Sequence, residues 1–229
     1  MAPWNGKLSR WNGMVGKRKQ EKGGEEGARN CPTAGIVLAA GMSTRLGRPK
    51  HLIKIGGKTL LSRVVTAALE SELAEIVLVL GPEADQVLVA LGSVANHERL
   101  RTVINEKYQD GMAGSLQAGL ATVQEQYPAV MFLLGDQPLI DAEAINSLLR
   151  YFWSADRDIC VPVQGGKRGN PVCFSRRFYG QILALQGDKG AREIIAGHPE
   201  DVLLVEIENP SFFLDIDCAE DLEKLLTLC

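Results

Sequence analysis

The stretch AGIVLAAGMSTRLGRPK, residues 34–50, gives the strongest indication of the fold. Its first seven residues form a short apolar run that ends at Gly41, which is typical of a buried parallel strand. The loop that follows carries glycines together with arginine and lysine side chains. Glycine lets a backbone wrap closely around an anion, and the loop after the first strand of an α/β sheet lies at the ligand-binding edge. The stretch therefore predicts a strand over 34–40 and a loop that binds a polyphosphate, most simply that of a nucleotide.

The chain beyond this loop alternates apolar strand patterns with helical spacing. Helical patterns follow the strands in turn, as crossover connections require. The expected strands are 34–40, 75–81, 101–105 and 129–138, and the expected helices are 59–71, 83–91, 114–126 and 141–153, the last with Asp141 as its N-cap. This order predicts an α/β fold with a single doubly wound, mostly parallel sheet and helices on both faces.

The pattern changes after residue 157. DICVPV (158–163), GGKRG (165–169) and NPVCFS (170–175) together predict a hairpin. Helical patterns follow at 176–185 and 188–197, then a strand at 201–207 and a last helix from Ala219. We expect one domain over residues 32–229. Residues 1–31 are rich in glycine and charge, without apolar periodicity, and we expect a disordered N-terminal extension there.

Composition excludes several classes of protein. The net charge of −3 disfavours nucleic acid as the main partner, and no stretch approaches the ~18 apolar residues that span a bilayer. The five cysteines are scattered and form no CxxC knuckle or disulfide pattern, which favours a reducing cytoplasm.

The cationic loop fails two common nucleotide motifs. A P-loop needs Lys and then Ser or Thr after its second glycine, but Gly47 is followed by Arg48 and Pro49. The dinucleotide-binding GxGxxG needs a glycine where Ser43 stands. ATPase and dehydrogenase functions are therefore disfavoured. Arg45 can donate two hydrogen bonds to two phosphate oxygens at once, and Lys50 provides a point charge. The alternative is that this is simply a basic loop on the surface.

Acidic side chains follow two distant apolar segments. Asp136 ends the most hydrophobic strand, at the same sheet edge as the glycine loop, so it can hold Mg²⁺ against substrate phosphates. Asp215 and Asp217 flank one residue of an expected short strand, which sends both to the same side. Asp217 has a simple alternative role as the N-cap of the last helix. The acids and the loop together favour a metal–triphosphate site.

Six motifs in order carry a resemblance. LAAGMSTRLGRPK resembles the LAAGxSxRMGxxK signature of nucleotidyltransferases that attach CTP or GTP to small phosphorylated acceptors. DGMAGSLQAGL, GDQPLI, RGNPVCF, GDKGAR and LDIDCAEDL continue the similarity. Over about residues 34–226 the chain resembles the molybdopterin nucleotidyltransferase family, in particular its molybdenum cofactor cytidylyltransferase branch. It departs where Leu46 replaces Met and where Cys218–Ala219 replaces Thr–Pro.

The resemblance implies a role for each matching position. Arg45 and Lys50 would bind the triphosphate and, with Asp136, make up the catalytic set; Asp136 and Asp217 would hold Mg²⁺. Ala40 and Ser115 would lie at the base and ribose. The implied nucleotide site comprises Leu38, Ala39, Ala40, Gly41, Arg45, Lys50, Gly81, Ser115 and Asp136, and the implied acceptor site comprises Gly169, Asn170, Lys189 and Arg192.

GDKGAR also has a physical interpretation of its own. It opens a predicted helix, so its N–H groups and two cations could take the pterin phosphate, while Asp188 could instead be a plain cap.

The implied reaction is Mg²⁺-dependent transfer of CMP from CTP to the terminal phosphate of molybdenum-molybdopterin, with release of pyrophosphate. An ionised phosphate nucleophile needs no general base, so we assign none of the histidines a catalytic role and expect only His51 to line the site. Expected partners are CTP, the molybdopterin-type acceptor and an apo-molybdenum hydroxylase. The alternatives are a guanylyl or sugar-phosphate nucleotidyltransferase, or an accessory maturation protein for a molybdenum hydroxylase such as xanthine dehydrogenase.

Overall fold

The protein is built around one central sheet, seen in a computed structural model that describes residues 31–41, 50–188, 190–216 and 218–228. The sheet has eight strands, with seven in the order β10-β7-β9-β6-β1-β4-β5 and β8 paired to β7. Its strands are β1 (Thr33–Ala39), β4 (Glu75–Leu80), β5 (Leu100–Ile104), β6 (Ala129–Leu134), β7 (Ile159–Gln164), β8 (Lys167–Arg168), β9 (Val172–Ser175) and β10 (Val202–Glu206). A separate hairpin joins β2 (Lys54–Ile55) to β3 (Lys58–Thr59).

Most neighbouring strands run parallel, as expected. β1 pairs in parallel with both β4 and β6, β4 with β5, and β7 with β10. β9 is antiparallel to β6 and to β7, and β8 to β7. Because the chain goes from β1 to β4 on one side and later to β6 on the other, the order of strands switches at β1. In open α/β sheets such a switch leaves a crevice beyond the carboxyl ends of the strands.

The expected hairpin is present with one added feature. β7 and β9 are antiparallel, with Ile159 opposite Phe174 and Cys160 opposite Cys173. The turn after β7 first forms the short β8, and β9 then inserts between β7 and β6. Cys160 and Cys173 are fully buried, and burial raises the pKa of the Cys160 thiol to about 12. These two thiols therefore act as small apolar core side chains.

Seven α-helices and six short 3₁₀ turns occur within the described residues. The α-helices are α1 (Leu60–Glu70), α2 (Ala84–Leu91), α3 (Met112–Val123), α4 (Ala142–Ser154), α5 (Tyr179–Leu183), α6 (Arg192–Gly197) and α7 (Ala219–Leu228). The 3₁₀ turns are η2 (Lys50–Leu52), η3 (Gly92–Asn96), η4 (Tyr108–Asp110), η5 (Arg176–Phe178), η6 (Pro199–Asp201) and η7 (Pro210–Phe213). Asp141 accepts a hydrogen bond from the Ala144 N–H at 2.8 Å, which confirms it as the N-cap of α4. Across the described ranges, every helix is too short or too polar to cross a membrane.

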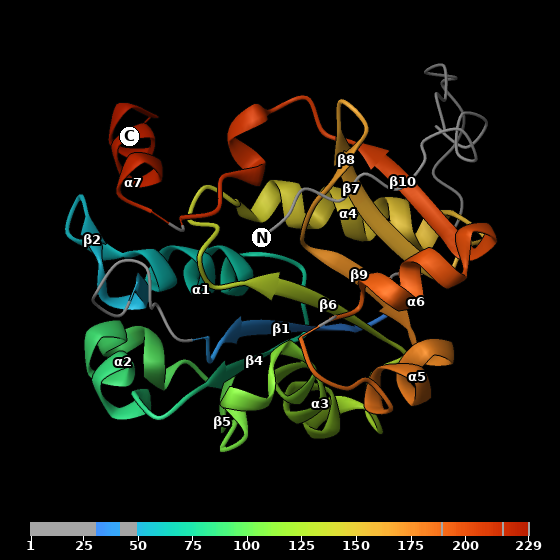
Figure 1. Ribbon diagram of the computed structural model, residues 1–229, viewed down its shortest axis with the longest axis horizontal. Helices are drawn as coiled ribbons and strands as arrows, with labels where there is room; N and C mark the ends of the chain where they lie inside the picture. The colour runs from blue at the N-terminus through green and yellow to red at the C-terminus, as the bar shows by residue number, and fades with distance from the viewer. Residues whose placement is uncertain (1–30, 42–49, 189, 217, 229) are drawn as a thin grey trace.

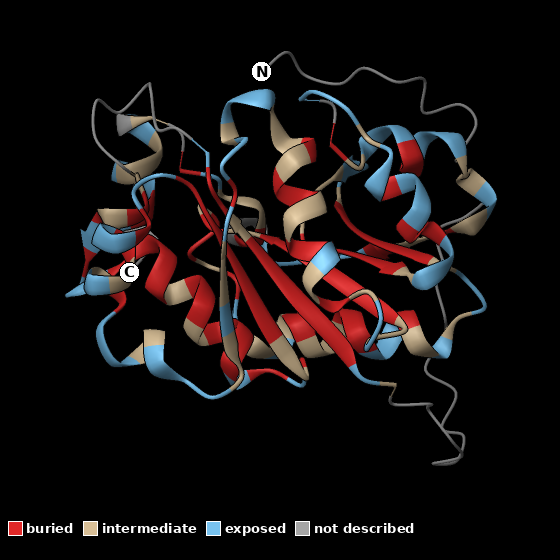
Figure 2. Cartoon of the chain, turned by 90° about the horizontal axis from the view of Figure 1, so that it is seen from below, coloured by how far each residue is buried: buried red, intermediate tan, exposed pale blue. Residues whose placement is uncertain are grey.

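Alternation along the strands divides the core into two layers. Val37, for example, faces the layer covered by α1, α2 and α4, whereas its neighbour Ile36 faces the layer covered by α3, α5 and α6. Figure 1 shows α3 and α5 on one side of the strands and α1 and α4 on the other. In Figure 2 the central strands are buried and the outer surfaces of the helices are exposed. The doubly wound sheet is therefore confirmed.

A third, smaller apolar cluster lies beside the main core. Ile53, Ile55 and Leu60 from the β2–β3 hairpin and the start of α1 pack there with Ile216 and Leu225. This cluster joins α7 to the hairpin and buries Ile216 completely. The C-terminal segment is thereby held at the carboxyl edge of the sheet.

Two expectations about local structure were wrong. Residues 214–216 belong to no strand, because they lie beyond the ends of the ladders; the Ile216 N–H instead donates to the Asp136 carbonyl at 3.1 Å. The helix expected over 188–197 begins only at Arg192. Gly187 and Asp188 instead pair with the start of α3, as described below.

Candidate active site

The carboxyl ends of four parallel strands gather the candidate residues. β1 leads into Ala40 and Gly41, β4 into Gly81, β5 into Asn105 and β6 into Asp136. Register pairs Leu38 with Leu134 and Ala39 with Leu80, so these strands end at the same level. Among the described positions expected to bind a nucleotide, those at the ends of β1, β4 and β6 therefore share one edge of the sheet.

The ends of β1 and β6 approach each other closely at Gly135. Its N–H donates to the Leu38 carbonyl at 3.0 Å. A Cβ on Gly135 would lie 3.0 Å from Leu61 Cδ1 and 3.1 Å from both Ala39 Cβ and Leu38 O. A Cβ here would force these neighbours to move by a few tenths of an ångström, and the next residue, Asp136, follows directly at the end of the sheet.

Lys50 and Asp136 form an ion pair at this edge. Lys50 begins the 3₁₀ turn η2, and its Nζ donates to Oδ2 of Asp136. The two side chains are only 15% and 16% exposed. Residues 86 positions apart in the sequence thus place one positive and one negative group together at the carboxyl edge of the sheet. Together they can bind a phosphate and a metal ion.

His51 follows Lys50 in the same 3₁₀ turn and is buried. Among the residues that the structure describes, neither ring nitrogen has a hydrogen-bond partner of ordinary geometry. Burial lowers the pKa of His51, and the Lys50 charge lowers it further, against smaller opposing effects of Asp136 and of the Gly41 backbone. The imidazole is therefore neutral at pH 7. His51 thus lies next to Lys50, and its place in the lining of the site stays a prediction.

The residues expected at the base form a second group at the edge. Gly81 packs against the backbone of Ala40, where a Cβ would lie 3.0 Å from the Ala40 carbonyl oxygen. The Ala40 methyl is buried in the layer that also holds Leu116 of α3. Ser115, one residue earlier on α3, accepts a hydrogen bond from Asn105 Nδ2 at 3.0 Å. Sequence reasoning missed Asn105, although its place directly after a strand was the available signal.

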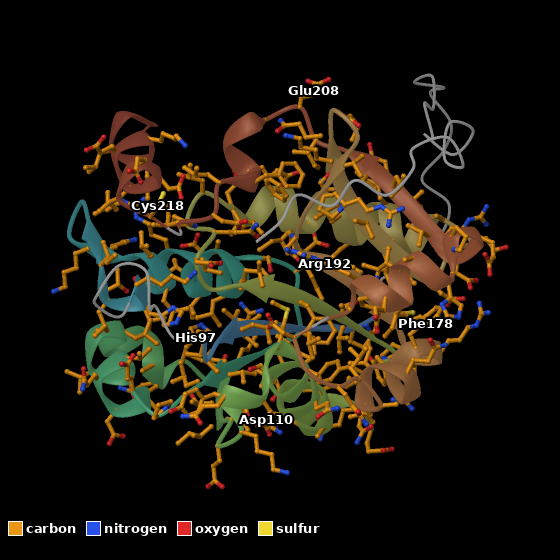
Figure 3. All side chains as sticks on the ribbon, viewed as in Figure 1. His97, Asp110, Phe178, Arg192, Glu208 and Cys218 are labelled. Atoms are coloured by element: carbon orange, nitrogen blue, oxygen red, sulfur yellow. The ribbon has the colours of Figure 1, made fainter. Side chains whose placement is uncertain are left out.

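Gly169, on the expected acceptor side, is held between two elements. Its N–H donates to the Pro162 carbonyl at 2.9 Å, and a Cβ would overlap the Phe213 ring. Asn170 follows, joined to Pro171 by a cis peptide bond. Figure 3 labels Arg192, which begins α6, near the middle of the view. Gly169, Asn170 and Arg192 thus belong to elements other than those of the expected nucleotide side, and their role toward an acceptor stays a prediction.

The GDKGAR segment caps a different helix from the one expected. The Asp188 carboxylate accepts from the Met112 N–H at 3.3 Å, and the Gly187 carbonyl accepts from the Ala113 N–H at 3.1 Å. Both N–H groups belong to the first turn of α3. Asp188 is thus a cap, as one alternative held, but of α3 rather than of the helix that follows it. The segment links the acceptor side to the helix that carries Ser115.

The acidic C-terminal segment lies beside Asp136. Asp215 Oδ1 accepts from the buried Gln137 amide at 2.7 Å. Three predicted site residues, Arg45, Lys189 and Asp217, lie outside the residues that the structure describes. Among the described residues no three metal-binding side chains cluster together. Mg²⁺ usually needs only one or two carboxylates because substrate phosphates complete its shell, so Asp136 in this position fits that ion.

Fold and site together define a class of protein. The mostly parallel sheet has its switch point at β1, and a lysine, a carboxylate and a close-approaching glycine backbone meet at its carboxyl edge. Such a protein binds a phosphorylated ligand across the carboxyl ends of its strands.

Comparison with known proteins identifies the family. Residues 35–202 match the model of the MobA-like NTP transferase domain. The chain is 31% identical to nicotine blue oxidoreductase from Paenarthrobacter nicotinovorans, over 86% of this chain and 97% of that protein. It is 28% identical to molybdenum cofactor cytidylyltransferase from Escherichia coli K12, over 81% and 91%. The solved structure of Rv0371c from Mycobacterium tuberculosis in complex with manganese aligns with a TM-score of 0.71 and 25% identity, over 86% of this chain and all of that one.

The chain belongs to the MobA-like NTP transferase family, and it is a nucleotidyltransferase. The resemblance drawn from the six sequence motifs is thereby confirmed.

Proposed function

We propose that the protein transfers CMP from CTP to the terminal phosphate of molybdenum-molybdopterin and releases pyrophosphate, in a reaction that requires Mg²⁺. The observation that carries this proposal is the Lys50–Asp136 ion pair at the carboxyl edge of the sheet, where Ala40 and Gly41 follow β1. The E. coli relative, named molybdenum cofactor cytidylyltransferase, supports the choice of nucleotide and acceptor.

The chemistry asks for charge neutralisation and alignment rather than for a base. A terminal phosphate oxygen of the acceptor attacks the α-phosphorus of CTP, a P–O bond forms, and pyrophosphate leaves with the electrons of the broken bond. The attacking oxygen is already ionised at pH 7, so a neutral His51 needs to remove no proton. Lys50, with Arg45, would bind the triphosphate and stabilise the charge that develops on it.

Asp136, with Asp217, would hold the metal. Within the described residues, Oδ1 of Asp136 accepts no hydrogen bond, so the carboxylate retains a free oxygen for an ion. Mg²⁺ held by these carboxylates would supply neutralisation of phosphate charge. Gly169, Asn170, Lys189 and Arg192 would receive the acceptor.

A relative's name raises a second candidate, an oxidoreductase. The similarity to nicotine blue oxidoreductase covers 97% of that protein. The loop after β1, however, lacks the second glycine of a dinucleotide-binding fingerprint, since Ser43 stands there. Guanylyl transfer, transfer to a sugar phosphate and an accessory role in maturing a molybdenum hydroxylase remain alternatives. An apo-hydroxylase that takes up the product is the partner we propose, in a reducing cytoplasm.

Ligand screening followed by an activity assay tests the proposal. CTP with Mg²⁺ is expected to raise the melting temperature more than GTP, ATP or UTP; a ligand at 100 times its Kd stabilises by ~2.7 kcal/mol. Pyrophosphate release should then require CTP, Mg²⁺ and molybdenum-molybdopterin together. Preferred use of GTP would overturn the cytidylyl assignment. Reduction of nicotine blue by reduced nicotinamide cofactors, without pyrophosphate release in the first assay, would favour the oxidoreductase.

A further inference from the structure

A chain of hydrogen bonds connects the end of β5 to α3. Asn105 lies just beyond β5, where its N–H donates to the Leu80 carbonyl at 2.8 Å. Its side chain is 5% exposed, and its amide Nδ2 donates to Ser115 Oγ at 3.0 Å. Ser115 is 7% exposed. Both side chains thus sit in a largely desolvated part of the edge, where each hydrogen bond has a defined partner.

The direction of this chain follows from its first bond. The Lys107 N–H donates to Asn105 Oδ1 at 3.0 Å, and a backbone N–H can only donate. Oδ1 must therefore be the oxygen of the amide, and the NH₂ group must face Ser115. Gly114 lies next to this amide: a Cβ there would lie 3.3 Å from Nδ2 and 3.5 Å from Oδ1, so the glycine leaves the room that the amide occupies. The orientation of the amide is set by its bond to the Lys107 N–H.

A hydroxyl that accepts from an amide keeps its own proton for another partner. Ser115 Oγ accepts from Asn105, so its O–H is left to donate. Among the described residues, no group accepts that proton. Ser115 differs in this from Thr122 of the same helix, whose hydroxyl donates to the Ala118 carbonyl four residues earlier. The Ser115 hydroxyl is thus a directed donor at the edge where β1, β4 and β5 end.

We propose that Asn105 is a positioning residue that fixes the Ser115 hydroxyl as a hydrogen-bond donor toward the nucleobase, and that this polarity selects cytosine over guanine. The inference rests on the proposed function, which places a nucleotide at this edge. Cytosine presents two adjacent acceptors, O2 and N3, on its pairing edge. Guanine presents donors at N1 and N2, with O6 as the single acceptor on that edge. A donor held in place can thus form a hydrogen bond with cytosine, whereas it meets another donor at N1 and N2 of guanine.

The discrimination comes mainly from the penalty on the wrong base. A buried donor that meets another donor leaves both unpaired, and sites of this kind reject mismatched ligands more strongly than sites that depend on size alone. A serine free to rotate would not discriminate, because it could donate to one base and accept from the other. The Asn105 amide removes that freedom.

The inference is tested by reversing the direction of the hydrogen bond between Asn105 and Ser115. Asn105→Asp preserves shape, but a carboxylate accepts from both the Lys107 N–H and the Ser115 O–H, which turns Ser115 into an acceptor toward the base. The measurement is the Kd of CTP and of GTP with Mg²⁺, by calorimetry, for the wild type, Asn105→Asp, Ser115→Ala and the double variant. The added negative charge weakens the binding of both nucleotides alike. The ratio of the two Kd values is therefore the readout. Melting curves check folding.

We expect the preference for CTP to fall by about tenfold or more in Asn105→Asp, and no further change when the same substitution is made in the Ser115→Ala background. If Asn105→Asp does not fold, the same measurement is made on Asn105→Ala. There the preference for CTP should fall by a smaller factor, because the serine hydroxyl becomes free to rotate. An unchanged ratio in a folded variant, or an equal fall in the Ser115→Ala background, overturns the inference and leaves the proposed function intact. A wild type that binds neither nucleotide, or binds GTP better, refutes the proposed function and the inference with it.

Discussion

At the scale of single residues, the site depends on a small number of partly buried charges. Lys50 and Asp136 form an ion pair, and both side chains are mostly shielded from water. A triphosphate and its metal ion would bring charges of the opposite kind to each of these side chains. The pair is thus arranged to exchange one set of electrostatic partners for another at little cost in reorganisation.

We predict that Asp136→Asn loses most transferase activity, by about 10²-fold or more, while the protein still folds. The substitution keeps the shape of the side chain and removes the charge that would hold Mg²⁺. The measurement is single-turnover pyrophosphate release across a Mg²⁺ titration, together with melting curves.

Asp215→Asn is the matched control for that prediction. Asp215 is exposed, and its Oδ1 accepts from the Gln137 amide, a bond that the oxygen of asparagine can preserve. We expect only a mild effect. Near-normal turnover by Asp136→Asn at low Mg²⁺ would show that the metal is held elsewhere.

At the scale of elements, α3 is placed by glycines as much as by apolar side chains. Gly119 lies on the helix face against β1 and β4, where a Cβ would overlap Ile36 Cγ2 and lie 3.0 Å from Val79 Cγ2. At its start, Gly111 approaches Gly187 so closely that a Cβ would lie 2.6 Å from the Gly187 carbonyl. These contacts set the depth and the angle at which α3 presents Ser115 to the sheet edge.

We predict that Gly119→Ala destabilises the protein by about 1–3 kcal/mol, even though alanine is the better helix former by about 1 kcal/mol. The added methyl would push α3 away from β1. Gly180→Ala is the control, because Gly180 is exposed in α5 and nothing lies within 4 Å of a Cβ there. Urea unfolding should move the two variants in opposite directions. A Gly119→Ala variant as stable as the wild type would mean that α3 can shift freely.

At the scale of the whole molecule, the described core begins at β1. Thr33 is fixed by three bonds: its Oγ1 accepts from Trp153 Nε1 at 3.0 Å and donates to the Cys31 carbonyl, and its carbonyl accepts from the Ala74 N–H. β1 occupies the centre of the sheet between β4 and β6. Among the described residues, the buried core clusters begin with Ala34 of β1.

We predict that a chain starting at Pro32 melts within a few degrees of the full-length protein and keeps its turnover. Residues 1–31 have no apolar periodicity with which to offset the entropy of ordering them. A chain starting at Ala40 is the control, since it lacks the central strand and should not fold. A large loss of stability or activity in the Pro32 chain would contradict the boundary that we propose.

Much of the site could be predicted from the sequence because it depends on local rules. Apolar runs ended by glycine located the central strands within a few residues, and parallel strands necessarily share a carboxyl edge. Asp136 and Lys50 could therefore be assigned to one site from their places in the sequence alone, and the structure shows them in contact. The N-cap role of Asp141 was likewise local and is confirmed.

Only the tertiary structure decided the contacts made across long distances in the chain. The sequence around Asp188 suggested a cap for the next helix, yet its partner is Met112, 76 residues earlier, because two loops meet at the start of α3. Residues 214–216 alternate like a strand but have no strand beside them to pair with. The burial of His51 and the bond from Asn105 to Ser115 depend on packing between separate elements. Periodicity reports which face of an element is buried; it carries no information about which distant side chain that face will meet.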